Sequence, residues 1–409
     1  MLTPTRPPGR VEFIFLNACL ISMVAMCIDA VLPALGMISA DFSVANPNDR
    51  QWVIGVMFLG LTLGQFFYGP LADRYGRRRT LFGGIGLFLV GSLLCWSAQD
   101  FEALLLGRLL QGVGVAGPRI VSTAMIRDRF KGVEMAQVSS LIMTVFIAVP
   151  VLAPAIGQVV LWFGDWRDLF LGYILWGAAM VLWVGLRQPE SLPNVRPLNP
   201  AAIAATAIEV LKNRPAMLYT LAVGSCFGGL VGFLLASQQI YQDYYQVGDA
   251  FALYFGASAF AVGIASFANN RLVQRFGMRA MVSTASLLGG VWTLTFAAIN
   301  LWTPLGLAGF LVMLVPLFFA MGLCFGNLNA LAMEPMGHLA GTASAIIGTL
   351  SSLVSVVAGS YVGNLYDGSI DVWSFGVGLM ILLSWVVVQL AIRSEGLDTN
   401  LPAEQKNVS

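Results

Sequence analysis

The sequence predicts an all-α membrane protein of twelve transmembrane helices, built as two pseudo-symmetric six-helix bundles. Of its 409 residues, 57% are hydrophobic and only 11% are charged, whereas a typical soluble domain carries about 25% charged residues. Twelve mainly apolar runs reach the roughly 20 residues that a helix needs to cross a bilayer. The two halves of the chain also align with each other, which indicates an internal duplication.

Short connections join the expected spans, so little chain is left for a soluble domain. The first ten residues resemble the basic start of a signal peptide, but eleven further spans follow, so we expect an uncleaved first helix. The twelve spans are expected at approximately 13–36, 52–72, 80–98, 103–126, 135–161, 168–187, 216–239, 251–273, 279–299, 305–333, 342–365 and 372–393.

One long connection divides the chain into six spans and six. Residues 187–215 are rich in proline and polar side chains, which is typical of a linker, and we expect a short surface helix at 200–212 within them. The expected domains are an N-terminal six-helix bundle at 1–187, a cytoplasmic linker at 188–215, a C-terminal six-helix bundle at 216–393 and a cytoplasmic tail at 394–409.

A shift of 201 residues aligns the two halves around one connection. Four residues meet their counterparts in this alignment: Leu71 with Leu272, Arg74 with Arg275, Gly76 with Gly277, and Arg78 with Arg279. Paired six-helix bundles with a site at their interface are typical of transporters that rock between two states. An enzyme needs no such duplication, so we expect a transporter and not an enzyme.

The positive charges indicate how the chain is oriented. An even number of spans places both termini on one side, and 18 of the 22 lysines and arginines fall on that side. Arg50 and Arg167 lie in the opposite loops, and Arg108 and Arg119 lie inside the fourth span. The positive-inside rule therefore predicts cytoplasmic termini.

Several classes of chemistry are not expected. The five cysteines lie inside spans without CxxC spacing, and no carboxylate cluster surrounds the single histidine, His338, so we expect no metal site. The chain has no GxxxxGK[ST] loop for a nucleotide. We therefore expect no cofactor and no nucleic-acid partner, and an ion gradient as the energy source. One chain contains a complete pathway, so we expect a functional monomer.

The stretch "GPLADRYGRR" (69–78) places charge between two apolar runs. We expect its glycines to permit close helix approach and tight turning. We expect Asp73 to lie against the N-terminus of the eleventh span, near 338–344, where the helix dipole favours an anion. The alternative, for the arginines alone, is a topology signal. The expected cytoplasmic gate consists of Gly69, Asp73, Arg74, Gly76, Arg77 and Arg78.

The same loop carries a family resemblance. "GPLADRYGRRRTL" (69–81) resembles the signature loop of the major facilitator superfamily, and "RLLQGVGVA" (108–116) resembles its second motif. Three further stretches resemble the bicyclomycin and chloramphenicol resistance (Bcr/CflA) branch of the drug:proton antiporters: "IDAVLPAL" (28–35), "AMIRD" (124–128) and "GHLAGTAS" (337–344). The resemblance covers nearly the whole chain and implies the major facilitator fold with proton-coupled multidrug efflux.

The fifth span departs from the family pattern. The antiporter motif, usually g-x-x-x-G-P-x-x-G-G, reads "VPVLAPAIGQ" (149–158), which keeps Pro154 and Gly157 but replaces other glycines. Pro150 and Pro154 remove backbone donors and are expected to bend the helix. The replaced glycines weaken the inference to antiport.

Ionisable groups inside spans are costly and by default functional. Asp29 and Arg108 are expected roughly 24 to 27 Å above the cytoplasmic edge, at 1.5 Å per helical residue, and we expect them to pair. Asp29 would take and release the transported proton and Arg108 would set its proton affinity, a role that the resemblance supports for Arg108. The alternative is that Asp29 caps or anchors the first span near the outer interface.

Several polar residues are expected to line a substrate cavity. Arg119 follows Arg108 by eleven residues, which returns to within about 20° of the same helix face, so it would face the cavity and favour an anionic group. The alternative is that Arg119 snorkels toward the inner interface. The other expected cavity residues are Gln111, Gln238, Tyr241, Asn327 and Asn329.

The leading hypothesis is a proton-coupled antiporter of the bacterial inner membrane that exports small amphipathic compounds or drugs by alternating access. An alternative within transport is a carrier of one metabolite, such as a carboxylate-bearing natural product, a siderophore or a nucleoside, with Arg119 as the anchor. A third hypothesis, from another class, is a non-transporting membrane sensor.

Overall fold

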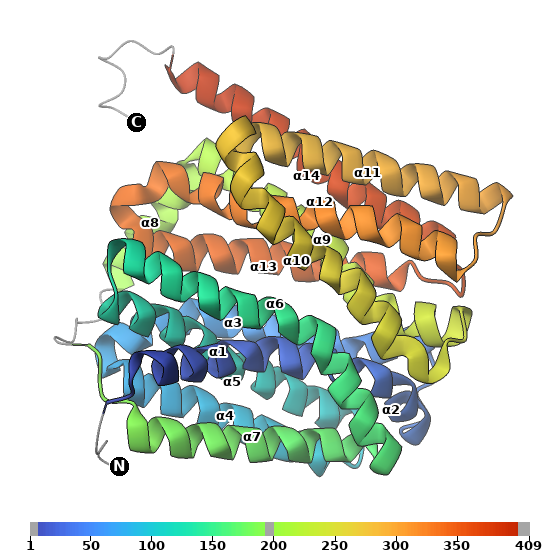
Figure 1. The fold of residues 1–409 in the computed structure, drawn as a ribbon, viewed down its shortest axis with the longest axis horizontal. Helices are drawn as coiled ribbons and strands as arrows, with labels where there is room; N and C mark the ends of the chain where they lie inside the picture. Colours follow the sequence, from blue (N-terminus) through green and yellow to red (C-terminus); the bar gives the residue numbers. More distant parts are fainter. Residues whose placement is uncertain (1–6, 193–199, 400–409) are drawn as a thin grey trace. The chain divides into compact units, whose positions relative to one another are not determined.

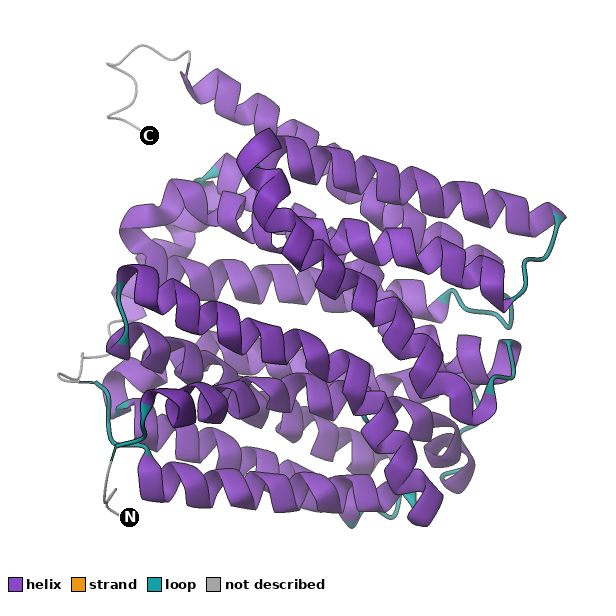
Figure 2. Ribbon diagram, viewed as in Figure 1, coloured by secondary structure: helices purple, strands orange, loops and turns teal. Residues whose placement is uncertain are grey.

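A computed structural model describes residues 7–192 and 200–399 of the chain (Figure 1), and within these residues the regular secondary structure is entirely helical (Figure 2). Eleven of the described helices are long and apolar enough to cross a membrane, and Ala148–Phe163 is a shorter apolar stretch of a further helix, α6. The predicted fold class of twelve spanning helices is therefore confirmed.

The chain forms two compact units. Unit 1 contains Met1–Asn199 together with Leu234–Phe260, and unit 2 contains Pro200–Phe233 and Ala261–Ser409. Unit 1 therefore holds the expected first bundle together with a segment that lies beyond the linker in sequence.

Unit 1 is built from α1 to α7 and from two short helices of the later segment. Its elements are α1 (Arg10–Asp29), η1 (Leu32–Ala34), α2 (Leu35–Asp41), η2 (Pro47–Gln51), α3 (Trp52–Tyr75), α4 (Arg77–Trp96), α5 (Phe101–Arg129), α6 (Gly132–Phe163), α7 (Trp166–Arg187), the π-helix η3 (Gln239–Tyr244) and η4 (Gly248–Ala250). We call the end where α1 begins and α7 ends the near end, and the end where α2 ends and α7 begins the far end.

The first span is interrupted in the middle. The segment Arg10–Asp41 is apolar enough to cross a membrane as one unit, but α1 stops at Asp29 and the helix restarts with Pro33 in the first turn of η1. Proline has no backbone N–H to donate and clashes with the preceding turn, so a helix usually breaks just before it. Asp29 therefore lies at a helix end in the interior of the span.

Unit 2 contains the surface helix of the linker and most of the second half. Its elements are α8 (Pro200–Lys212), α9 (Arg214–Gln238), α10 (Phe251–Phe276), α11 (Met278–Trp302), α12 (Leu307–Met333), η5 (Glu334–Leu339), α13 (Ala340–Asn364) and α14 (Asp371–Thr399), of which α9 and α10 each extend into unit 1. The short helix expected at 200–212 is α8. The expected tail is helical up to Thr399, and residues 193–199 and 400–409 lie outside the described residues.

The predicted duplication is visible at one connection in each half. Gly76, between α3 and α4, has φ +91°, and Gly277, between α10 and α11, has φ +78°. Glycine adopts positive φ without the steric penalty that other residues meet. The two glycines are 201 residues apart, so the shift found in the sequence also relates the helix boundaries on either side of them.

Candidate functional site

The carboxyl group of Asp29 is buried without a partner. Asp29 is the last residue of α1 and is 4% exposed. Among the described residues, no hydrogen bond or ion pair reaches its side chain. An ionisable group inside a membrane span costs several kcal/mol unless a partner or a proton compensates it. Asp29 therefore lies in the interior of unit 1 without a compensating partner among the described residues, and its role as the proton site stays a prediction.

Arg108 is fully buried on α5, but it does not pair with Asp29. Its Nη2 donates to the carbonyl of Cys27 at 3.0 Å, and its Nε donates to the carbonyl of Val53 at 2.9 Å. Hydrogen bonds to backbone carbonyls take the place of the expected ion pair with Asp29. Because α1 ends at Asp29, the last carbonyls of this helix have no helical partners and can accept from Arg108. A cation is favourable at such a C-terminus, so Arg108 fastens α5 to the end of α1, and through Val53 it also contacts the start of α3.

A layer of hydrogen bonds surrounds Arg108. Its Nη1 donates to Oε1 of Gln111 at 2.9 Å, and Nε2 of Gln111 donates to the hydroxyl of Ser92 on α4 at 2.8 Å. The hydroxyl of Tyr173 donates to the carbonyl of Met26 at 3.2 Å. Gln111, expected to line a cavity, is thus fully buried between α5 and α4, and its oxygen is used by Arg108.

Gly157 connects the antiporter motif to the break in α1. A β-carbon at Gly157 would collide with the carbonyl oxygen of Ala30, the residue after Asp29. The backbone of α6 therefore packs directly on the end of α1, which is the close approach that small residues allow between membrane helices. Pro150 and Pro154 lie inside α6, on the near-end side of this contact.

We expect Gly157→Ala to destabilise the protein by about 1 to 3 kcal/mol, because overpacking at a backbone contact forces the helices apart. The measurement is the thermal unfolding midpoint of purified protein. Gly86→Ala is the matched control, since Gly86 is also a helical glycine and nothing lies within 4 Å of its added β-carbon. Equal midpoints for the two variants would contradict the contact.

A second polar group lies at the near end, around Arg77. The Nη1 of Arg77 pairs with Asp73 at 2.6 Å, and its Nε pairs with Asp128 at 3.0 Å. Arg77 thus joins the end of α3, the start of α4 and the end of α5. The expected contact of Asp73 with the eleventh span involves unit 2 and stays a prediction.

Glu190, which follows the end of α7, caps the N-terminus of α4 next to Arg77. Its Oε1 accepts from the backbone N–H of Arg77 at 2.8 Å and its Oε2 accepts from that of Arg78 at 3.1 Å. The first N–H groups of a helix have no helical partner and attract an anion. A β-carbon at Gly76 would collide with the carboxylate of Glu190, so this position needs glycine for space as well as for positive φ.

The remaining residues of the expected gate differ in their surroundings. Arg78 donates through Nη2 to the carbonyl of Gly185 at 2.8 Å, whereas Arg74 is exposed. The expected close approach at Gly69 is not formed, because nothing lies within 4 Å of a β-carbon there.

At the far end of unit 1, η2 binds η3. Arg50 forms an ion pair with Asp243. Gln51 donates through Nε2 to Oε1 of Gln239 at 2.7 Å, and Nε2 of Gln239 donates to Oδ1 of Asn48 at 2.8 Å. We call these five residues the far-end latch. Isolated π-helical turns such as η3 are frequent at functional sites.

Two expected cavity residues of the second half lie beside this latch in unit 1. Gln238 is 2% exposed and donates to Oε1 of Gln242 at 2.9 Å. Tyr241 is fully buried, and its hydroxyl forms a hydrogen bond of 2.9 Å with the hydroxyl of Ser258. Tyr241 is therefore bonded to α10, whereas Gln238 donates to η3 and its Oε1 is buried without a hydrogen-bond partner.

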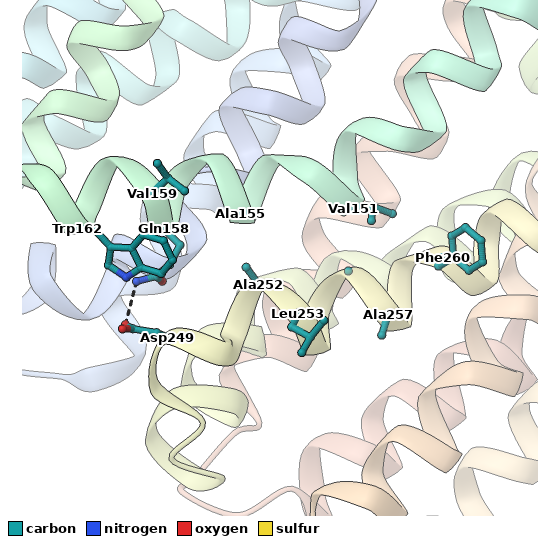
Figure 3. A pocket seen from close by; sticks show the side chains of 11 residues that line it. Val151, Ala155, Gln158, Val159, Trp162, Asp249, Ala252, Leu253, Ala257 and Phe260 are labelled. Atoms are coloured by element: carbon teal, nitrogen blue, oxygen red, sulfur yellow. Dashed lines mark hydrogen bonds between the residues drawn. The ribbon is translucent and has the colours of Figure 1, made fainter.

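A cavity of about 590 Å³ lies between α6 and the start of α10 (Figure 3). Its walls are mostly apolar, and Gln158 and Asp249 lie together at one end, where Nε2 of Gln158 donates to Oδ1 of Asp249 at 3.0 Å. We call this cavity the α6–α10 groove. The lining residues are Val151, Ala155, Gln158, Val159, Trp162, Asp249, Ala252, Leu253, Gly256, Ala257 and Phe260.

The remaining expected cavity residues belong to different units, so each is described within its own unit. Asn327 is buried in unit 2 and donates to Oδ1 of Asn269 at 2.7 Å. Asn329 is exposed and donates to the carbonyl of Phe325 in its own helix. Arg119, on α5 in unit 1, is half-buried, and no described residue forms a hydrogen bond or ion pair with its guanidinium.

Comparison with known proteins decides the family. The family described as Major Facilitator Superfamily matches residues 14–359. The chain belongs to this superfamily. It is 33% identical over 364 residues to "Uncharacterized MFS-type transporter YdgK" of Bacillus subtilis, covering 87% of this chain and 89% of that protein. It is 30% identical over 373 residues to "Bicyclomycin resistance protein homolog" of Haemophilus influenzae, covering 87% and 90%.

A solved structure agrees with the superfamily fold. The "Crystal structure of D-xylose-proton symporter" matches with a TM-score of 0.70 at 14% identity, covering 93% of this chain and 97% of that one. At this identity the match shows the fold alone. The predicted membership of the major facilitator superfamily and its Bcr/CflA-like branch is confirmed, and the chain is a multi-pass membrane transporter, not an enzyme.

Proposed function

We propose that this transporter is a proton-coupled antiporter that exports small amphipathic compounds, drugs among them, across the bacterial inner membrane. The observation that carries the proposal is the carboxyl group of Asp29, which is buried within the apolar segment Arg10–Asp41 without an ionic or hydrogen-bonding partner among the described residues. The bicyclomycin resistance protein homolog among the relatives supports drug export.

The proton acts at the junction of α1 and α6. An ionised Asp29 needs water or a cation, whereas a protonated Asp29 is tolerated in an apolar environment. Because Gly157 of α6 packs on Ala30, the residue after Asp29, a rearrangement at this contact would change the surroundings of Asp29. Arg108 holds the end of α1 in place through Cys27 and acts as a positioning residue for Asp29.

We infer the sides of the membrane from the charge distribution. Most lysines and arginines lie in the connections on the same side as the two termini. By the positive-inside rule, the near end of unit 1 is then cytoplasmic and the far end faces outward. In alternating access the two sides open in turn. The far-end latch therefore closes the outer side and has to break when that side opens, while the Arg77 group with Asp73 and Asp128 acts on the cytoplasmic side.

We expect Asp243→Asn to speed amide hydrogen exchange in residues 239–244 about fivefold, because a loss of about 1 kcal/mol changes an opening equilibrium by that factor. The charge-swapped double variant, Arg50→Asp with Asp243→Arg, should restore slow exchange. The measurement is hydrogen–deuterium exchange read by mass spectrometry on the whole protein.

The matched control for the latch is Asp41→Asn. Asp41 pairs with Arg167 at 2.8 Å, also at the far end, but this ion pair does not involve residues 234–260. Exchange in residues 239–244 should be unchanged in Asp41→Asn. If it rises as much as in Asp243→Asn, the latch is not what holds η3.

A second candidate function is the export of an anionic metabolite. It is favoured by Arg119, an arginine inside a span whose planar donor fork has no described partner and suits a carboxylate. Arg119→Ala would then weaken export of anionic substrates tenfold or more, a loss of about 1.4 kcal/mol, and leave neutral drugs unaffected.

The test of the function is transport in proteoliposomes with an imposed pH gradient. Exchange of an amphipathic drug such as chloramphenicol for protons supports antiport, and drug-dependent proton flux measured with an internal pH dye gives the coupling directly. Substrate movement that ignores the pH gradient would contradict proton coupling. No substrate movement and no proton flux with any compound would favour a sensor.

A further inference from the structure

The surface helix α8 is joined to the spanning helix α9 through Asn213 alone. The backbone N–H of Asn213 donates to the carbonyl of Glu209 at 3.0 Å, and its side-chain Oδ1 accepts from the backbone N–H of Ala216 at 2.9 Å. Asn213 therefore closes α8 and caps α9. Because the segment Arg214–Tyr244 is long and apolar enough to cross a membrane, this junction holds α8 at the level where the chain enters the bilayer.

The helix α8 has two different faces within unit 2, where it packs on α13. Thr206 and Val210, one turn apart, are buried. Ala204, Ile208 and Leu211 form a second stripe with the spacing i, i+4, i+7, and all three are exposed, Ile208 by 52% and Leu211 by 54%. At 3.6 residues per turn, the centres of the two stripes are roughly 150° apart around the helix. The packing that buries Val210 therefore leaves an apolar stripe uncovered.

Two cations stand beside this stripe. Lys212 follows Ile208 by four residues, so it lies on the same side of the helix one turn on, and Arg214 begins α9. Both side chains are exposed, and neither forms a hydrogen bond or ion pair with a described residue. Residues 200–215 contain one acidic side chain, Glu209, against these two cations. An apolar stripe with unpaired cations at the bilayer surface is typical of a helix that lies among lipid headgroups.

We propose that α8 is a lipid-binding helix that selects anionic phospholipids. Ile208 and Leu211 insert among the upper parts of the acyl chains, and Lys212 and Arg214 bind the phosphate groups. Because Asn213 caps α9 directly after α8, the bound lipid also fixes the angle between the two helices. The lipid site requires neither a transported substrate nor a proton, so it is testable even if the proposed antiport fails.

The test is photolabelling of the full-length protein in phosphatidylcholine nanodiscs. The probe is phosphatidylglycerol with a diazirine on the acyl chain close to the glycerol, and phosphatidylcholine with the same chain is the probe without net charge. We expect phosphatidylglycerol to label residues 203–214 at least about fivefold more strongly, and unlabelled phosphatidylglycerol to displace it. A fivefold preference corresponds to about 1 kcal/mol, the contribution of one basic residue near an anionic surface.

The variants separate the cations from the apolar stripe. The double variant Lys212→Gln with Arg214→Gln should lose the preference for phosphatidylglycerol and keep the labelling by phosphatidylcholine, whereas Lys212→Arg with Arg214→Lys should keep the preference. Ile208→Ser with Leu211→Ser should lower labelling by both lipids. The matched control is Arg271→Gln, which removes an exposed cation of α10 in the same unit and should label as the wild type does.

Three results would overturn the assignment. Equal labelling of 203–214 by the two lipids would mean that α8 does not select an anionic headgroup. A preference that persists in Lys212→Gln with Arg214→Gln would place the anionic lipid elsewhere. No labelling of 203–214 by either lipid would mean that something other than lipid covers the stripe. Asp29→Asn should label normally, so transport in that variant and labelling in the α8 variants report on the two proposals separately.

Discussion

In Asp29→Asn, drug export driven by a pH gradient is expected to fall to the background rate, while the protein still inserts and unfolds at the wild-type temperature. Asparagine has nearly the volume of aspartate but carries no exchangeable charge, so the site stays in one protonation state. The side chain has no described partner, so no contact is lost with the charge. The measurement is drug-dependent proton flux in proteoliposomes, together with drug counterflow at equal pH.

Counterflow distinguishes coupling from general damage. A variant fixed in the proton-free or protonated state can still exchange drug for drug, so we expect counterflow to persist when uphill transport is lost. Asp29→Glu should retain part of the coupled transport because it keeps a carboxyl group at the break of α1. Asp41→Asn, an exposed carboxyl on the same span, is the control and should transport normally. Undiminished uphill export in Asp29→Asn would remove this residue from the mechanism.

Arg108→Leu is expected to lower the free energy of unfolding by about 3 to 5 kcal/mol. The guanidinium donates to Val53, Gln111 and Cys27, and hydrogen bonds to a charged group contribute about 1.5 to 3 kcal/mol each. Recovery of the desolvation cost of the arginine offsets part of this loss. The measurement is the unfolding midpoint in detergent and the yield of folded protein.

Arg119→Leu is the matched control for that loss. Arg119 lies on the same helix, about three turns further along, but its side chain has no described hydrogen bond or ion pair. Its removal should leave the unfolding midpoint unchanged or raise it. If both leucine variants unfold alike, the carbonyl contacts of Arg108 do not stabilise the protein.

The fold was predictable because its signals are local in the sequence. Apolar runs gave the spans, and a proline-rich stretch gave the linker with its short helix, α8. The shift of 201 residues gave the related turns at Gly76 and Gly277, since positive φ favours glycine wherever the turn recurs. Charges inside spans also pointed to Asp29 and Arg108, because such residues are rare in lipid.

The contacts of the site were not predictable in the same way. Arg108 was expected to seek a carboxylate, but its partners are backbone carbonyls, which every residue carries and which no sequence pattern marks. Glu190 and Arg50 find their partners 113 and 193 residues away in the chain. Gln158 was visible only as a departure from the family motif, and its bond to Asp249 depends on how α6 meets α10.

The far-end latch has a consequence for how the polypeptide could be divided. Residues 234–260 belong to the second half by sequence but to unit 1 by packing, through non-covalent contacts such as that of Gln51 with Gln239. The peptide linker is therefore not the sole tie joining the two halves. Two fragments, cut between 193 and 199 and synthesised separately, would each still carry one side of this attachment.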